Sequence, residues 1–145
     1  MSAEIGLRPM EPEDRGFVVK SFLTSYGRSH YAAGVPGAVL VELLDPMLIV
    51  WPTTLAVAPD GELLGWVCGK DGNLAWVFVK PDFRGRGVAR ALLAHAGVGR
   101  QVTMPFAPTK GPGGKSFAAY VRGKGLTVHF RPYLPLVTVQ ELGKA

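Results

Sequence analysis

The sequence predicts a single α/β domain, and three observations lead to this class. Residues 54–58, 63–69 and 74–79 are short apolar stretches separated by Pro-Asp-Gly and Asp-Gly-Asn turns, which is typical of antiparallel strands joined by hairpins. Apolar residues with helical spacing lie on both sides of this region. The 145 residues, 48% of them hydrophobic, are enough for one well-filled core, and no linker divides the chain. We therefore expect one domain over residues 1–145.

The N-terminal part is predicted to form one strand and two helices. Residues 5–8 alternate between polar and apolar positions, as a strand does. Pro12 and the two acids that follow it indicate the start of a helix over residues 12–26. Residues 39–44 are predicted to be a second, short helix.

The C-terminal part is predicted to continue with two helices and three strands. Glycines close the helices, and prolines separate the last two strands. The predicted elements are a helix at 88–95, a strand at 101–106, a helix at 116–122, a strand at 126–131 and an edge strand at 136–140.

The most informative stretch joins strand 74–79 to helix 88–95. Pro81 has no N–H, so sheet pairing must stop there. Gly85 and Gly87 allow backbone N–H groups to turn inward with no side chain in the way. The helix that begins near Val88 directs its unpaired N–H groups and the positive end of its dipole at the same place. The stretch predicts an anion site, and a pyrophosphate is its natural occupant.

Two other glycine-rich motifs are excluded. A dinucleotide-binding fingerprint requires a third glycine where Arg90 stands, and no parallel βαβ unit surrounds it. The segment 111–116 resembles the end of a P-loop, but Thr109 stands where that motif requires its first glycine. A surface turn that happens to be rich in glycine and arginine is the remaining alternative to an anion site.

The spacing Arg84-x-x-Gly87-x-Ala89, after a Val-x-Pro strand end, resembles the acetyl-CoA signature of the GNAT N-acetyltransferase superfamily. The predicted order of elements is similar to that fold over nearly the whole chain, and residues 21–26 resemble short GNAT-like proteins encoded by tailed phages. The resemblance implies a mixed, mostly antiparallel sheet of six to seven strands with about four helices. It also implies a bulge or splay after the fourth strand, where strand 74–79 parts from its neighbour.

The same resemblance implies acetyl-CoA as the cofactor. The pantetheine arm would pair with the backbone at the end of strand 74–79, and the pyrophosphate would lie on the turn and the helix start. Two arginines could reach the outer phosphates, or they could form a solvated helix face. The residues expected at coenzyme A are Val77, Phe78, Val79, Arg84, Gly85, Arg86, Gly87, Val88, Ala89, Arg90 and Ser116.

The reaction that the resemblance implies is direct attack of a primary amine on the thioester. Glu42 is the candidate general base, with Asp45, His30 and Asp82 as alternatives. Tyr120 is the candidate general acid, because many family members carry a tyrosine on the late helix. Tyr120 lies one position before the expected place, so it could instead be a packing residue.

Charge is distributed unevenly along the chain. Residues 1–79 hold five Lys/Arg against nine Asp/Glu, whereas residues 80–145 hold eleven against two. A polyanionic ligand on the second half explains this difference; nucleic acid and a solvated basic face are the alternatives. A non-catalytic acyl-CoA-binding or interaction module and a nucleic-acid-directed acyltransferase therefore stay open beside the N-acetyltransferase.

The remaining expectations concern the acceptor, the setting and the thiol. The acceptor, an unidentified small-molecule or peptide amine, would enter from the side made by residues 24–52. No apolar run is long enough to span a membrane, no export signal is recognisable, and the single cysteine, Cys68, predicts a buried thiol in a cytoplasmic protein. The three histidines are far apart in sequence, so no metal is expected. A monomer or a homodimer fits the sequence.

Overall fold

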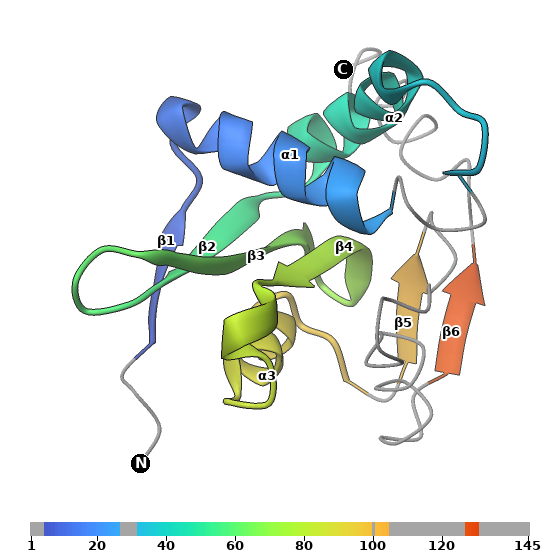
Figure 1. The fold of residues 1–145 in the computed structure, drawn as a ribbon. Coiled ribbons are helices and arrows are strands. Elements are labelled where there is room, and N and C mark those ends of the chain that lie inside the picture. Colours follow the sequence, from blue (N-terminus) through green and yellow to red (C-terminus); the bar gives the residue numbers. More distant parts are fainter. Residues whose placement is uncertain (1–4, 27–31, 100, 105–126, 131–145) are drawn as a thin grey trace.

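The computed structural model describes residues 5–26, 32–99, 101–104 and 127–130. Its six strands form one sheet in the order β1-β2-β3-β4-β5-β6 (Figure 1). Pairing is antiparallel from β1 to β4 and parallel from β4 to β6, which confirms the mixed, mostly antiparallel sheet. The strands are β1 (Gly6–Pro9), β2 (Thr53–Val57), β3 (Leu63–Lys70), β4 (Asn73–Val79), β5 (Gln101–Met104) and β6 (Thr127–Phe130).

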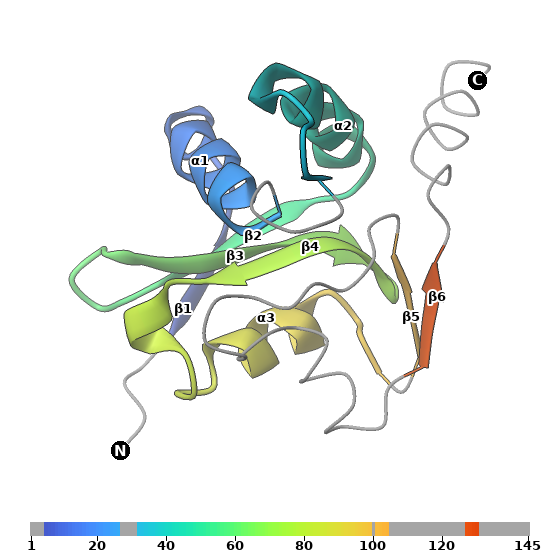
Figure 2. The same cartoon turned by 45° about the vertical axis from the view of Figure 1, so that its right-hand side comes forward.

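Helices cover both faces of the sheet. Helices α1 (Arg15–Ser25) and α2 (Gly37–Val50) lie on one face, and α3 (Val88–His95) lies on the other (Figure 2). Short 3-10 helices precede α1 at Pro12–Asp14 and follow β4 at Pro81–Phe83. The helix predicted at 116–122 and the strand predicted at 136–140 lie outside the described residues.

Helix α2 is longer than the sequence predicts, because it continues through Pro46 to Val50. A proline inside a helix costs about 3 kcal/mol or more through the lost hydrogen bond and its ring clash. Leu44 and Met47, on either side of the proline, are buried against the sheet. Each such burial contributes about 1.5–3 kcal/mol, which offsets the cost of the proline. The expected end of this helix at residue 44 was therefore wrong.

Each face of the sheet has its own apolar core. Side chains alternate along the strands, so Trp66 faces α1 and α2 while Val67 faces α3. The first core includes Val18, Phe22, Leu40, Leu44, Met47, Trp51, Leu55, Trp66, Cys68 and Trp76. The second includes Leu64, Val67, Leu74, Val79, Val88, Leu92, Leu93, Val102 and Met104.

Two serines of α1 bind two buried tryptophans of the sheet. The Trp66 indole N–H donates to the Ser21 hydroxyl at 2.7 Å, and the Trp76 indole N–H donates to the Ser25 hydroxyl at 3.0 Å. The serines are one helical turn apart, so a single face of α1 serves both β3 and β4. These bonds satisfy indole donors that would otherwise be buried without partners, and they fix the position of α1 over the sheet.

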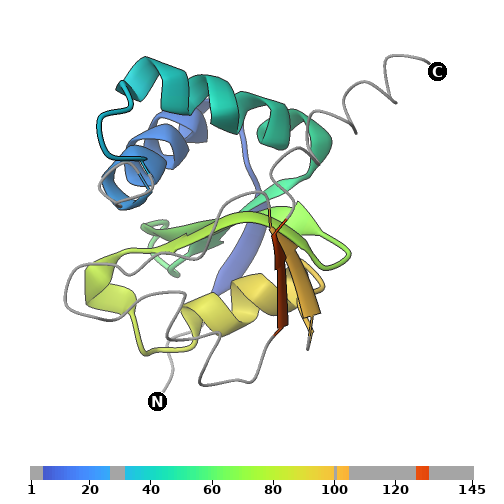
Figure 3. The same cartoon turned by 90° about the vertical axis from the view of Figure 1, so that its right-hand side faces the viewer.

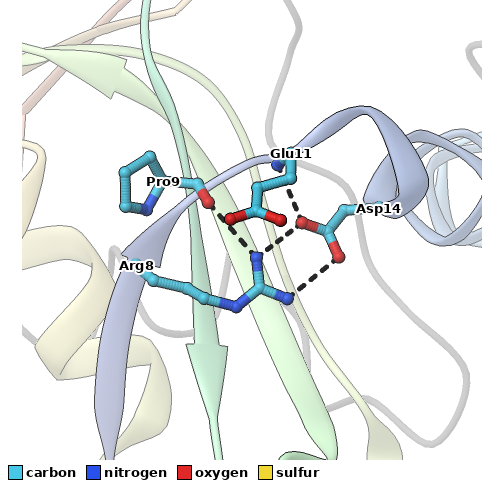
Figure 4. A network of polar contacts seen from close by, with 4 residues as sticks. All are labelled: Arg8, Pro9, Glu11 and Asp14. Carbon is cyan, nitrogen blue, oxygen red and sulfur yellow. Dashed lines mark hydrogen bonds and ion pairs between the residues drawn. The ribbon is translucent and has the colours of Figure 1, made fainter.

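An ion pair joins β1 to the start of α1 (Figure 4). Two guanidinium nitrogens of Arg8 contact the two carboxylate oxygens of Asp14 at 2.6 and 3.0 Å. The Glu11 backbone N–H donates to the same carboxylate at 2.8 Å. The hydrogen bond and charge of Arg8 hold the pKa of the Asp14 carboxyl below its usual value, against the opposing effect of burial.

Strand β4 parts from β5 soon after it begins. The pairing between them consists of Asn73 opposite Thr103, next to a bond from the Thr103 N–H to the Gly72 carbonyl at 2.9 Å. Strands β5 and β6 stay paired over residues 101–104 and 127–130, and they stand apart from the far end of β4 (Figure 3). This arrangement confirms the predicted splay after the fourth strand.

Candidate functional site

The turn between β4 and α3 has the conformation that its glycines require. Pro81 begins the 3-10 helix, and the Phe83 N–H donates to the Lys80 carbonyl at 2.9 Å. Gly85 has φ of 78° and Gly87, the residue that caps α3, has φ of 86°. Both values lie in the left-handed region, which side chains disfavour. The chain can therefore fold back into α3 immediately after the turn.

A run of backbone N–H groups lies open at this turn. Among the described residues, no oxygen accepts a hydrogen bond from the N–H groups of Gly85 to Arg90. The Arg84 N–H, which we expected to join this run, donates instead to the Pro81 carbonyl at 3.3 Å. The open groups include the first N–H groups of α3, so the positive end of the helix dipole lies at the same place.

The described residues do not crowd the two glycines of this turn. An ideal Cβ placed on Gly85 or on Gly87 would meet no heavy atom of the described residues within 4 Å. Gly85, Arg86, Gly87 and Arg90 are exposed, whereas the Val88 side chain is buried in the core on the α3 side. Val88 thus contributes its backbone to the turn and its side chain to packing.

The end of β4 offers polar backbone groups to the gap left by β5. The Lys80 N–H donates to the Leu64 carbonyl of β3 at 2.9 Å. Hydrogen bonding alternates along an antiparallel pair, so Phe78 also bonds to β3 while Val77 and Val79 direct their N–H and C=O groups the other way. Val77 and the N–H of Val79 can pair with a ligand on this side of β4, whereas the Val79 carbonyl already accepts a hydrogen bond from Arg84. The backbone of Phe78, which we also expected there, is used by the sheet.

Two arginines of the turn already make contacts. The Arg84 Nε–H donates to the Val79 carbonyl at 3.0 Å, and the Arg86 guanidinium lies 5.6 Å from the centre of the Phe83 ring. Arg90 is exposed on α3, one helical turn beyond Arg86. The positions of Arg86 and Arg90 are compatible with both roles expected of them, contact with phosphates and a solvated helix face. The bond of Arg84 was missed by the sequence analysis.

Residues on the α1 side of β4 were also missed. The rings of Phe17 and Phe78 are 6.2 Å apart and nearly perpendicular, and Lys80 Nζ lies 5.4 Å from the centre of the Phe17 ring. Lys80 also contacts Glu62 at 3.7 Å. Trp76 and Phe78 of β4, and Lys80 directly after it, occupy every second position. This alternation was the signal that their side chains share one face.

The described candidates for catalysis come from two elements, helix α2 and the 3-10 helix after β4. Glu42 is exposed on α2, and Asp82 is exposed in the 3-10 helix. Asp45 forms an ion pair with Arg15 of α1 at 2.7 Å. Tyr120, His30 and Ser116 lie outside the described residues. The structure therefore brings none of the described candidates into contact with another.

The thiol of Cys68 is a core group, as expected. It is fully buried, and its Sγ is 3.4 Å from the Met47 carbonyl oxygen. Burial raises its pKa to about 12, and the nearby Thr53 hydroxyl opposes this shift. Within the described part of the chain, no three His, Cys, Asp or Glu side chains gather as a metal site would need. The same residues contain no helix with the length and apolar character needed to cross a membrane.

These features define a class of protein. It is an α/β domain in which two neighbouring strands of the sheet diverge beside the start of a helix, and the N–H groups at that helix start have no acceptor among the described residues. A family model described as the acetyltransferase (GNAT) domain matches residues 38–109, which include β2 to β5, the turn and α3. The chain belongs to the GNAT acetyltransferase family. No curated protein matches it.

The fold is also similar to that of solved structures. The apo form of YjaB from Escherichia coli matches with a TM-score of 0.52 and 26% identity, over 64% of each chain. A GCN5-related N-acetyltransferase from Rhodopseudomonas palustris matches with a TM-score of 0.49 and 21% identity, over 65% of this chain and 64% of that one. YhbS from Escherichia coli, in complex with CoA, gives 0.45 and 18%, over 65% and 54%. The matched part thus spans less than two thirds of these relatives, and the YjaB match confirms the fold.

Proposed function

We propose that this protein is an N-acyltransferase that transfers an acetyl group from acetyl-CoA to a primary amine. One observation carries the proposal: among the described residues, the N–H groups of Gly85 to Arg90 have no acceptor, and they follow directly on a strand end where Val77 and the Val79 N–H face away from β3 without a partner. Family membership independently favours this activity. Acetyl-CoA has the matching sequence of groups, a diphosphate followed by an amide-bearing arm.

The residues at the turn fit a diphosphate. Hydrogen bonds to charged groups contribute about 1.5–3 kcal/mol each, and a helix dipole adds about 0.3–1 kcal/mol. Several such bonds are sufficient for micromolar affinity. The backbone of Val77 and the N–H of Val79 would orient the arm along β4. Bound acetyl-CoA would supply a thioester carbonyl as the electrophile, with the acceptor entering on the side of α1 and α2.

Glu42 is the described acid that best fits a general base on this side. Among the described residues Glu42 has no ion-pair partner, whereas Asp45 is held by Arg15. A positioned base contributes about 10²–10⁴-fold to the rate. Glu42→Gln should therefore lower kcat by a factor in that range while the affinity for CoA stays unchanged. An unchanged kcat would remove Glu42 from the proposal.

Titration calorimetry with CoA and acetyl-CoA, followed by thiol release over a panel of amines, tests the proposed function. Binding with amine-dependent thiol release would support the N-acyltransferase. Binding without release for any amine would favour the non-catalytic acyl-CoA module. Release that depends on DNA, with a steep salt dependence of DNA affinity, would favour the nucleic-acid-directed acyltransferase. The absence of binding to both ligands would refute the proposal.

A further inference from the structure

The side chain of Arg84 connects the turn to the end of β4. Its Nε–H donates to the Val79 carbonyl at 3.0 Å, in a partly buried position. The bond encloses the 3-10 helix Pro81–Phe83, which is itself closed by the bond from the Phe83 N–H to the Lys80 carbonyl. A single side chain therefore fixes the end of the strand relative to the start of the anion-binding turn.

The Val79 carbonyl is available to Arg84 because β4 and β5 have diverged at this end of β4. The Lys80 N–H bonds to Leu64, so the Val79 carbonyl points away from β3. Among the described residues, β5 pairs with β4 at Asn73 and supplies no donor at this end. A partly buried carbonyl without a donor is unfavourable, and the Nε–H of Arg84 provides one.

We propose that Arg84 is a positioning residue that acts through this hydrogen bond to the backbone rather than by placing its positive charge at the ligand. The bond holds the turn so that the N–H groups of Gly85 to Arg90 face the ligand. The Nε–H, directed at Val79, does not contact the phosphates. This inference rests on the proposed function, since the ligand in question is coenzyme A.

Three substitutions of Arg84 separate the effect of its hydrogen-bond donor from the effect of its positive charge. In Arg84→Gln, the side-chain nitrogen is the same number of bonds from Cα as Nε in arginine, so the donor stays and the charge is lost. In Arg84→Lys, a methylene takes that position and the charge stays. In Arg84→Met, a methyl group takes that position, and donor and charge are both lost. Lys20→Met, on the exposed surface of α1, is the control for the change in net charge.

Calorimetry with CoA gives the first test. We expect Arg84→Gln to bind within about threefold of the wild type, and Arg84→Lys and Arg84→Met to bind about tenfold more weakly, as one lost hydrogen bond predicts. Lys20→Met should bind like the wild type. In turnover, Arg84→Met should raise KM for acetyl-CoA with a smaller effect on kcat. If Arg84→Lys binds like the wild type and Arg84→Gln binds weakly, the charge is what matters and the inference is overturned.

A second measurement does not need the ligand. The Arg84 Nε–H should give a slowly exchanging NMR signal in the free protein, and the amide signals of Gly85 to Arg90 should shift in Arg84→Met but not in Lys20→Met. A fast-exchanging Nε–H would overturn the inference even if CoA binds. Failure of the wild type to bind CoA, with a protected Nε–H, would instead refute the proposed function and leave the contact with Val79 supported.

Discussion

Replacing Gly87 with alanine separates the stability of the turn from its capacity to bind an anion. Gly87 has φ of 86°, where a residue with a side chain costs about 1–2 kcal/mol. No heavy atom of the described residues lies within 4 Å of the added Cβ, so none of them adds a clash to this cost. For a domain of this size, about 2–4 °C of Tm is lost per kcal/mol, so Tm should fall by about 2–8 °C.

The effect of Gly87→Ala on binding should be much larger. The methyl group would occupy the open space beside the free N–H groups. Loss of one charge-assisted hydrogen bond, about 1.5–3 kcal/mol, weakens the affinity for CoA by about 10- to 150-fold. Thermal unfolding and calorimetry measure the two effects separately.

Gly61 provides a matched control for this substitution. It has φ of 91°, and an added Cβ there would also meet no heavy atom within 4 Å, but it lies in the turn between β2 and β3. Gly61→Ala should lose a similar amount of Tm and bind CoA like the wild type. If Gly87→Ala and Gly61→Ala bind equally well, the turn is not the anion site and the reasoning is refuted.

Three further predictions concern stability and reactivity. In Gly65→Ala the new Cβ would lie 2.3 Å from the Phe78 carbonyl oxygen, so overpacking should lower the free energy of unfolding by about 1–3 kcal/mol or more; an unchanged denaturation midpoint would contradict this. Because Arg8 lowers the pKa of folded Asp14, their pair stabilises the protein above the unfolded pKa of about 3.9, and this stability is lost as pH falls through the lower folded pKa. Asp14→Asn should therefore cost about 1–2 kcal/mol at pH 7, allowing for the partial exposure of Arg8, and the difference in Tm from the wild type should disappear in acid. The Cys68 thiol, with its pKa raised to about 12, should resist iodoacetamide at pH 8 until the protein unfolds, and rapid labelling of the folded protein would disagree with its burial.

The strands and helices were predictable where local patterns and packing agree. Alternation located β3 and β4 to within one residue, and the glycines around residues 85–97 located α3 at residues 88–95. The length of α2 was not predictable, because Pro46 gives a local signal to stop while the burial of Met47 depends on the sheet beneath it. The splay of β4 from β5 followed from the family resemblance, since no residue pattern states which strand β4 leaves.

The conformation of the turn between β4 and α3 was predictable for the same local reason. Pro81, Gly85 and Gly87 dictate the backbone conformation with little help from the rest of the fold. The bond of Arg84 to Val79 was not predictable, because it depends on which carbonyl the divergence of two strands leaves open. The ion pair of Asp45 joins residues 30 positions apart, and its geometry depends on how α1 crosses α2.

The pairing of β4 with β5 also has a consequence for how the chain folds. Strands β2, β3 and β4 are consecutive hairpin partners, so their contacts close short loops and can form early. Among the described residues, the parallel strands β5 and β6 join this meander at one residue pair, so we expect them to pair after it has formed. We therefore expect the point where β4 and β5 diverge to lie at the boundary between two cooperative units, one that folds early and one that folds late.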